Sequence, residues 1–113
     1  MKSTEINSRS VEVATMVIIH AGNSRKFVNE AIVFAKDFNF EMAKEKLEQA
    51  KKEITSAHKT QTEVIQAEAR GKPIEITLLL THAQDTLMTA MSEVHTAKHM
   101  IDLLQLIHDL KTE

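Results

Sequence analysis

The sequence predicts an all-α protein, an antiparallel bundle of three long helices. Over most of its 113 residues, apolar residues recur at alternating steps of three and four, which is the pattern of helices packed against near-parallel neighbours. Only two glycines and one proline punctuate the chain. Two short breaks, at residues 37–39 and 70–73, therefore divide it into three helical segments.

The composition restricts the class of protein. With 113 residues, 42% of them hydrophobic, and no Pro- or Gly-rich tract, residues 1–113 are predicted to form one domain with a modest core. A formal net charge of −2 argues against a general binder of nucleic acid or anionic membranes. The absence of cysteine excludes disulfides and a thiol nucleophile. Without a membrane-length apolar run or an export leader, we expect a soluble, unexported chain.

The first helical segment is expected to end near residues 37–39, where short polar residues can cap the helix that follows. Gly22 lies inside this segment, where glycine costs about 1 kcal/mol relative to alanine. We expect a kink or a close helix approach at Gly22 rather than a break. The residues predicted to be buried are Val13, Val17, Ala21, Ser24, Val28, Ala31 and Ala35.

The middle segment is expected to end at residues 70–73, because Gly71 can terminate a helix and Pro73 cannot continue one. Charges of both signs at residues 44–46 and 51–53 are predicted to lie on its solvated face. The residues predicted to be buried are Phe40, Ala43, Leu47, Ala50, Ile54, Ala57, Gln61 and Val64.

The last segment continues the pattern after Pro73. Residues 16–19 and 76–80, however, carry large apolar side chains around most of a helical turn, whereas a surface helix keeps one solvated side. We therefore predict a homo-oligomer that uses the first and third helices in its interface. The residues predicted to be buried within the bundle are Ile76, Leu80, Ala83, Leu87, Ala90, Val94, Ala97, Ile101 and Leu104.

His82 and Asp85 form the most informative local pattern. A step of three residues turns a helix through roughly 300° and raises it by about 4.5 Å, so the two side chains leave nearly the same face. Two interpretations are open. Either Asp85 holds a partly buried, structural His82, or His82 is a nucleophile whose neutral ring nitrogen accepts a phosphoryl group. The spacing alone does not choose between them.

The run His82-Ala83-Gln84-Asp85, followed by Leu87-Met88, resembles the active-site signature of lactose/cellobiose-type enzyme IIA components of the bacterial sugar phosphotransferase system. Several short signatures in the family's order and spacing extend the likeness over nearly the whole chain. They are Ala21-Gly22, Ser24-Arg25, Glu30-Ala31, Asp37-Phe38, Ala43, Leu47, Ala57-His58, Gln61-Thr62, Glu68-Ala69 and Gly71.

The resemblance implies a cytoplasmic phosphocarrier. His82, through its Nε2 atom, would accept a phosphoryl group from the phosphohistidine of HPr and pass it to a cysteine of the cognate IIB component. The phosphoryl group then goes to a β-linked di- or oligosaccharide entering through IIC. The absence of cysteine fits this role, since the thiol of the relay belongs to another polypeptide. Gln84 would support the phosphoryl site.

The resemblance further implies a homotrimer with Asp85 near its threefold axis. Three carboxylates brought together repel one another unless a cation binds them or some are protonated. Oxygen ligands suit Mg²⁺, so we expect one divalent cation per trimer, structural rather than chemical, with Asp85 as its ligand.

Two positions depart from the family pattern. Thr86 stands where members often carry a second histidine, and a hydroxyl cannot share a proton at neutral pH as an imidazole does. Lys36 stands where a glycine often precedes the Asp-Phe pair. Neither change removes the phosphoryl acceptor.

The other histidines do not compete with His82. His95 and His99 are four residues apart and could present two imidazoles to zinc, but no third ligand is evident, so we interpret the spacing as chance. His58 is expected to be a satisfied structural histidine, and packing or exposure accounts for His20 and for His108 near a frayed C-terminus. Two other functions stay open, a helical adaptor without catalysis and a regulatory relative that changes partners when phosphorylated.

Overall fold

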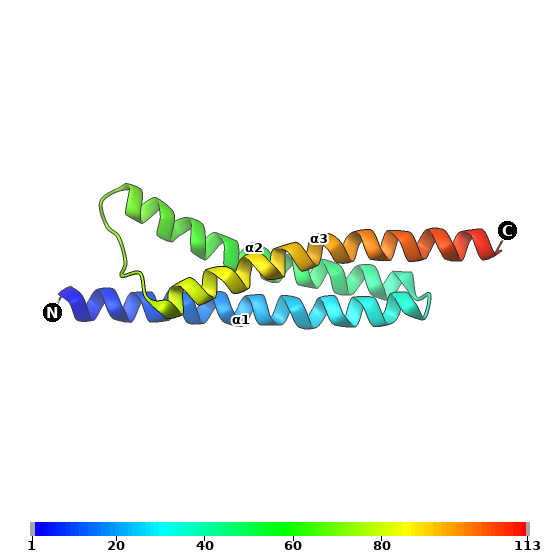
Figure 1. Cartoon of the computed structure of the whole chain (residues 1–113), viewed down its shortest axis with the longest axis horizontal. Coiled ribbons are helices and arrows are strands. Elements are labelled where there is room, and N and C mark those ends of the chain that lie inside the picture. Colours follow the sequence, from blue (N-terminus) through cyan, green and yellow to red (C-terminus); the bar gives the residue numbers. More distant parts are fainter. Residues whose placement is uncertain (1, 113) are drawn as a thin grey trace.

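The computed structural model describes the backbone of residues 2–112 and the side chains of residues 8–112. Its elements are α1 (Lys2–Lys36), α2 (Phe40–Ala69) and α3 (Leu78–Thr112). They run up, down and up in a bundle of 68 × 21 × 18 Å, and no strand occurs over residues 2–112 (Figure 1). The predicted antiparallel three-helix bundle is confirmed.

The turn between α1 and α2 lies where the sequence predicts it. The Phe38 N–H donates to the Ala35 carbonyl at 3.0 Å, and the Asn39 N–H donates to the Phe34 carbonyl at 2.9 Å. This pair of bonds is typical of a helix that terminates at a residue with a left-handed backbone, which is usually glycine. Here that residue is Phe38, with φ 61°. Asn39 then caps α2 by accepting a hydrogen bond from the Met42 N–H at 3.3 Å.

His108 stabilises this turn from α3. Its ring centroid lies 4.7 Å from that of Phe38 and 5.7 Å from that of Phe40. These contacts help to offset the backbone energy of a left-handed phenylalanine, which is of the order of 1–2 kcal/mol. The expectation of a frayed end at His108 was wrong, because α3 continues to Thr112.

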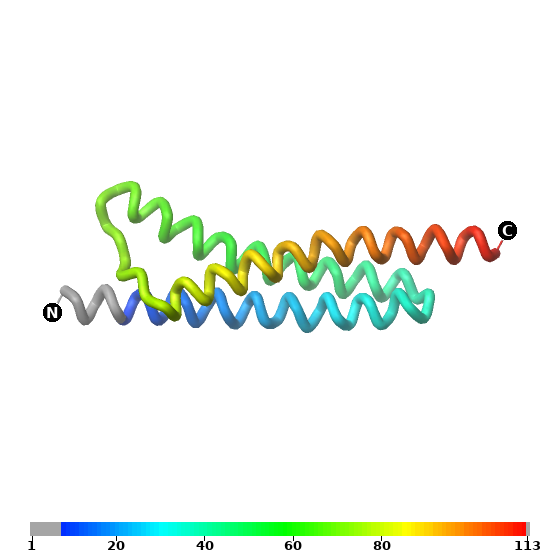
Figure 2. Tube along the Cα trace, in the orientation of Figure 1, coloured from blue at the N-terminus to red at the C-terminus, as the bar shows by residue number. Residues whose placement is uncertain are grey.

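The turn between α2 and α3 begins where the sequence predicts it. Gly71 has φ 81°, its N–H donates to the Glu68 carbonyl at 3.0 Å, and the Lys72 N–H donates to the Ala67 carbonyl at 2.8 Å. The trace then crosses from the end of α2, which leans away from the other helices, to the start of α3 beside α1 (Figure 2).

α3 begins at Leu78, two residues after Ile76, the first residue of the predicted stripe. The Thr77 hydroxyl accepts a hydrogen bond from the Leu80 N–H at 3.0 Å and so caps the helix. Ile76, expected in the buried stripe, precedes this cap and is 77% exposed. The apolar spacing of Ile76 matched the stripe, but the capping hydroxyl decides where the helix begins.

The core otherwise follows the predicted stripes. Most alanines of these stripes are fully buried, and one cluster of buried residues lies toward each end of the bundle. The cluster near the first turn comprises Val28, Ala31, Ala35, Phe40, Ala43, Leu47, Ala50, Val94, Ala97 and Ile101. The cluster near the second turn comprises Val13, Ala14, Val17, Ala57, Val64, Leu80, Ala83 and Leu87. Leu87, at 0% exposure, anchors α3 directly behind the predicted site.

Gly22 is neither a kink nor a point of close helix approach. Helix α1 runs through it from Lys2 to Lys36. A Cβ atom built on Gly22 meets nothing within 4 Å, so no neighbouring helix of the same chain requires a glycine there. Both sequence-based expectations for this residue were wrong for the isolated chain.

Two fully buried serines of α1 allow a matched test of packing. Ser10 Oγ donates to the Glu75 carbonyl at 2.7 Å, whereas Ser24 Oγ has no hydrogen-bond partner within the described part of the chain. Either Ser→Ala change gains the same helix propensity, so the difference between the variants isolates the hydroxyl. We expect the free energy of unfolding, measured by urea denaturation, to be about 1 kcal/mol higher for the Ser24→Ala variant than for the Ser10→Ala variant. Equal stabilities of the two variants would contradict this assignment.

Candidate functional site

The site lies on the first turns of α3. His82, Gln84 and Asp85 are exposed, while Ala83 between them is fully buried. Leu80 and Leu87 are buried on the same side as Ala83 and fix the rotation of α3 against the other helices. The packing of the helix therefore turns His82 and Asp85 outward.

The structure does not support a structural role for His82. Within the described side chains, no hydrogen bond or ion pair joins His82 to Asp85, and the imidazole is exposed rather than partly buried. The interpretation of a histidine held by Asp85 was therefore wrong for the single chain. An exposed ring nitrogen is what a phosphoryl acceptor requires.

Thr86 occupies the position after one full turn. Its hydroxyl donates to the main-chain carbonyl of His82 at 2.8 Å. This bond directs the hydroxyl to the backbone, so Thr86 does not replace a second imidazole beside the ring.

Exposed leucines lie one turn before His82 on the surface. Leu78 is 87% exposed and Leu79 is 39% exposed. A partner protein that covers these side chains excludes water from the histidine, which protects a phosphoryl group in transit from hydrolysis. Gln84 lies at the inner edge of the site and lines a small apolar pocket together with Gln61 of α2.

Exposed residues at heptad spacing run along the whole of α3. We call this set the outer stripe. Every member is exposed, and the set lies opposite the seam that packs on α1 and α2. Its members are Leu78, His82, Asp85, Thr89, Ser92, Thr96, His99, Leu103, Leu106 and Leu110.

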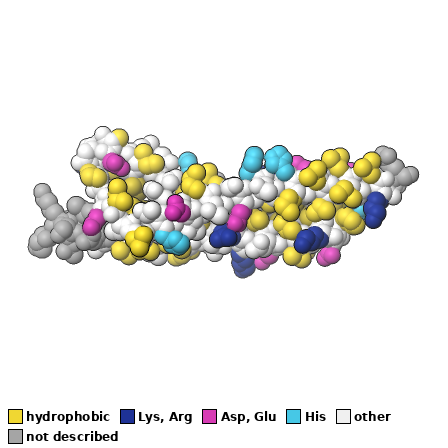
Figure 3. Space-filling model, in the orientation of Figure 1, with side chains coloured by type: hydrophobic (Ala, Val, Ile, Leu, Met, Phe, Trp, Pro, Cys, Tyr) yellow, Lys and Arg dark blue, Asp and Glu magenta, His cyan; other side chains and the backbone are white. Residues whose placement is uncertain are grey.

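The C-terminal end of the outer stripe was missed by the sequence interpretation. Leu103, Leu106 and Leu110 are large and exposed, and hydrophobic side chains gather over this part of α3 on the face in Figure 3. The sequence carries these leucines at the spacing of a second apolar heptad, but the buried seam, offset from it by about one residue, obscured this pattern. The exposure predicted around residues 16–19 is present at Met16 and Ile19.

A single chain does not hold a metal centre in the described region. No group of three or more His, Asp or Glu side chains there could hold a metal ion. Asp85 contributes one carboxylate, so a centre built on it needs ligands from other chains.

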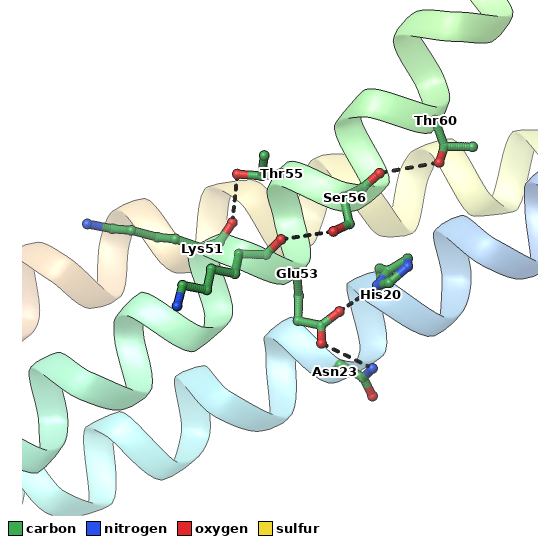
Figure 4. A network of polar contacts seen from close by, with 8 residues as sticks. His20, Asn23, Lys51, Glu53, Thr55, Ser56 and Thr60 are labelled. Carbon is green, nitrogen blue, oxygen red and sulfur yellow. Dashed lines mark hydrogen bonds and ion pairs between the residues drawn. The ribbon is translucent and has the colours of Figure 1, made fainter.

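His20 belongs to a polar contact between α1 and α2. Its Nδ1 lies 2.5 Å from Glu53 Oε2, and the Asn23 amide donates to the other oxygen of the same carboxylate at 3.5 Å (Figure 4). His20 therefore has a packing role, as expected.

The remaining histidines are exposed. His58 is exposed and makes no hydrogen bond among the side chains described, so its predicted structural role was wrong. The rings of His95 and His99 lie edge to face with centroids 4.9 Å apart.

None of the helices within residues 2–112 is long and apolar enough to cross a membrane.

Comparison with known proteins decides the family. The profile of the PTS system lactose/cellobiose-specific IIA subunit matches residues 12–105, which include the whole of α2, most of α1 and α3, and the His82–Asp85 site. The chain belongs to this family. It is thus a phosphotransferase component of a sugar phosphotransferase system, and the resemblance seen in the sequence is confirmed.

Relatives of this IIA chain share its length and fold. The lichenan-specific phosphotransferase enzyme IIA component of Bacillus subtilis is 42% identical over 102 residues, which cover 90% of this chain and 93% of the relative. The crystal structure of the cellobiose-specific enzyme IIA from Bacillus anthracis is 41% identical and superposes with a TM-score of 0.85, over 88% of this chain and 92% of that one.

A third relative was solved with a partner. The chitobiose-specific IIA protein of Escherichia coli, in solution structures of its complex with HPr, matches with a TM-score of 0.76 and 30% identity over 88% of this chain and 96% of that one.

Proposed function

We propose that this IIA chain is a cytoplasmic phosphohistidine carrier. His82 accepts a phosphoryl group from phospho-HPr and passes it to a cysteine of the cognate IIB component, during uptake of a β-linked di- or oligosaccharide through IIC. The observation that carries the proposal is the exposed His82 imidazole, one turn after the exposed Leu78 and Leu79, on a chain of this family. Relatives named for lichenan, cellobiose and N,N'-diacetylchitobiose support the sugar class, and a relative in complex with HPr supports the donor.

The chemistry needs little more than alignment. The lone pair of a neutral His82 ring nitrogen, taken as Nε2 from the family resemblance, attacks phosphorus in line with the bond to the donor imidazole, and that bond breaks as the new one forms. In the second transfer the IIB thiolate attacks the same phosphorus in line, and the bond between phosphorus and His82 breaks. Leu78 and Leu79 exclude water when either partner docks, and the Gln84 amide supports the phosphoryl oxygens as a hydrogen-bond donor.

The outer stripe supports assembly into a homotrimer. Three copies of α3 in contact along this stripe from Asp85 to Leu110, with Leu78 and His82 outside the contact, bury Leu103, Leu106 and Leu110, which a monomer leaves in water. Thr89 and Ser92 are small enough for the three helices to approach closely in the middle. Met16 and Ile19 of α1 add apolar surface to the same kind of contact.

Asp85 would lie on the axis of that trimer. Its carboxylate is exposed on the outer stripe and has no hydrogen-bond partner among the described side chains, so it is free for a ligand shared between chains. Three such carboxylates repel one another, and a hard cation with oxygen ligands, Mg²⁺ in our proposal, removes that repulsion. One cation per trimer would hold the assembly without taking part in the transfer.

Incubation with enzyme I, HPr and phosphoenolpyruvate tests the function. We expect one acid-labile, base-stable phosphoryl group per chain, because a phosphoramidate hydrolyses in acid, and we expect it to move to the cognate IIB. A helical adaptor would remain unlabelled. A regulatory relative would be labelled but would not pass the group to IIB. Either of those results would contradict the carrier.

A further inference from the structure

We propose that Ser10 of α1 is a positioning residue for the docking of HPr and IIB. Its buried hydroxyl holds the first turn of α3, which carries Leu78 and Leu79, the exposed leucines that exclude water from His82 in a complex. Because these leucines serve the transfer through His82, the inference rests on the proposed function. Ser10 acts through the backbone of another element and does not itself touch the phosphoryl group.

A chain of hydrogen bonds joins the start of α3 to α1. Ser10 Oγ donates to the Glu75 carbonyl at 2.7 Å, and Thr77 Oγ1 lies 3.4 Å from Ser10 Oγ. The same Thr77 oxygen accepts from the Leu80 N–H at 3.0 Å. A hydroxyl has one proton to donate, and Ser10 uses its proton on Glu75, so Thr77 is the donor between the two hydroxyls. The cap of α3 is therefore tied to α1 through Ser10.

The connection between α2 and α3, residues 70–77, depends on this tie. Figure 2 shows it as an irregular trace that reaches the start of α3 beside α1. Ile74 packs against the cluster near the second turn, whereas Glu75 and Ile76 are exposed. Among the described side chains outside the connection, Ser10 is the one that donates a hydrogen bond to its backbone. Since Ser10 is 0% exposed, water does not readily replace its hydroxyl.

The first turn of α3 and His82 are anchored in different ways. Leu78 and Leu79 directly follow the Thr77 cap, whereas Ala83 and Leu87, both 0% exposed, fix the helix around His82. Loss of the Ser10 hydroxyl should therefore loosen the two docking leucines and leave the phosphoryl acceptor in place. Such a change weakens the binding of a partner without slowing the chemical step.

Ser10→Ala in the full chain tests this role, with Ser24→Ala as the matched control. Ser24 is also fully buried on α1, but its hydroxyl has no hydrogen-bond partner within the described part of the chain. We expect Ser10→Ala to raise the KM for phospho-HPr and the Kd for unphosphorylated HPr by about fivefold, the effect of one hydrogen bond. The kcat per folded chain should stay unchanged. Ser24→Ala should match the wild type in all three constants.

Amide hydrogen exchange gives a readout that does not depend on transfer. The Leu80 N–H, which the Thr77 cap holds, should exchange several-fold faster in Ser10→Ala than in Ser24→Ala, because opening of the first turn becomes easier. The variant Thr77→Val removes the next hydroxyl of the chain. Added to Thr77→Val, Ser10→Ala should raise the Kd for HPr by less than it does alone, since the two residues act through one cap.

Three results would overturn the proposal. An unchanged KM and Kd in Ser10→Ala, or a fall in kcat per folded chain alone, would make Ser10 a merely structural residue. Equal exchange at Leu80 in Ser10→Ala and Ser24→Ala would show that the hydroxyl does not hold the first turn. Fully additive effects with Thr77→Val would show that Ser10 does not act through the cap. A wild-type chain that takes up no phosphate would contradict the carrier instead, and the exchange at Leu80 would still judge Ser10.

Discussion

Replacement of His82 by glutamine is expected to abolish phosphoryl transfer through this chain. Glutamine keeps a polar side chain of similar length but has no nucleophilic ring nitrogen, so no phosphoramidate can form. We expect the rate of phosphate transfer from phospho-HPr to IIB to fall by at least about three orders of magnitude, as when a catalytic nucleophile is removed. The measurement is the appearance of labelled phosphate on the IIA chain and then on IIB.

The same experiment has a matched control in His58→Gln. His58 is also an exposed histidine on a long helix, and its replacement should leave the transfer rate unchanged. His82 makes no side-chain hydrogen bond among residues 8–112, so His82→Gln should also unfold at the wild-type temperature. A His82→Gln chain that still carries phosphate would rule out His82 as the acceptor.

The double variant Leu103→Lys, Leu110→Lys is expected to separate the trimer into monomers. Both leucines are exposed on the outer stripe of the single chain, at 59% and 72%. Burial of each leucine side chain stabilises the assembly by about 2 kcal/mol in each copy, and the replacement removes this free energy. It also places like charges together on the axis. Sedimentation equilibrium should then give the mass of one chain, while the circular dichroism spectrum stays helical because the bundle core is untouched.

Ile65→Lys is the control for this variant. Ile65 is 55% exposed on α2, away from the outer stripe, so the same change there should leave the mass of the assembly unaltered. If the double variant keeps the wild-type mass, or if Ile65→Lys dissociates the protein as readily, the outer stripe is not the subunit contact.

The helices and their limits were predictable because local chemistry determines them. Gly71 adopts φ 81° after α2, and Asn39 caps the start of that helix, both as the residue types predict. Periodicity could not place the start of α3, since Ile76 fits the apolar spacing and only the Thr77 cap excludes it from the helix. Periodicity could not predict the structural role of Gly22 either, because its surroundings depend on which side of α1 the other helices cover.

The candidate site was predictable in identity but not in geometry. The likeness in sequence indicated His82, whereas only the rotation of α3, fixed by buried Leu87, shows that the imidazole is exposed. A packing role for His108 was among the expectations, but its partner Phe38 could not be predicted because the contact joins residues far apart in the chain. Leu103 and Leu110 were overlooked because two apolar heptads overlap on one helix, and only packing shows which one the bundle buries.

The most direct test of the account is to locate the phosphoryl group on the chain. Protein labelled with ¹⁵N in its histidine rings, phosphorylated by enzyme I and HPr, can be examined by two-dimensional NMR that correlates ring protons with ring nitrogens. We expect the ring nitrogens of His82 alone to shift, with the pattern of a phosphorylated Nε2, and to return when IIB is added. A shift at His58, His95 or His99 with His82 unchanged would contradict the central claim that His82 is the carrier.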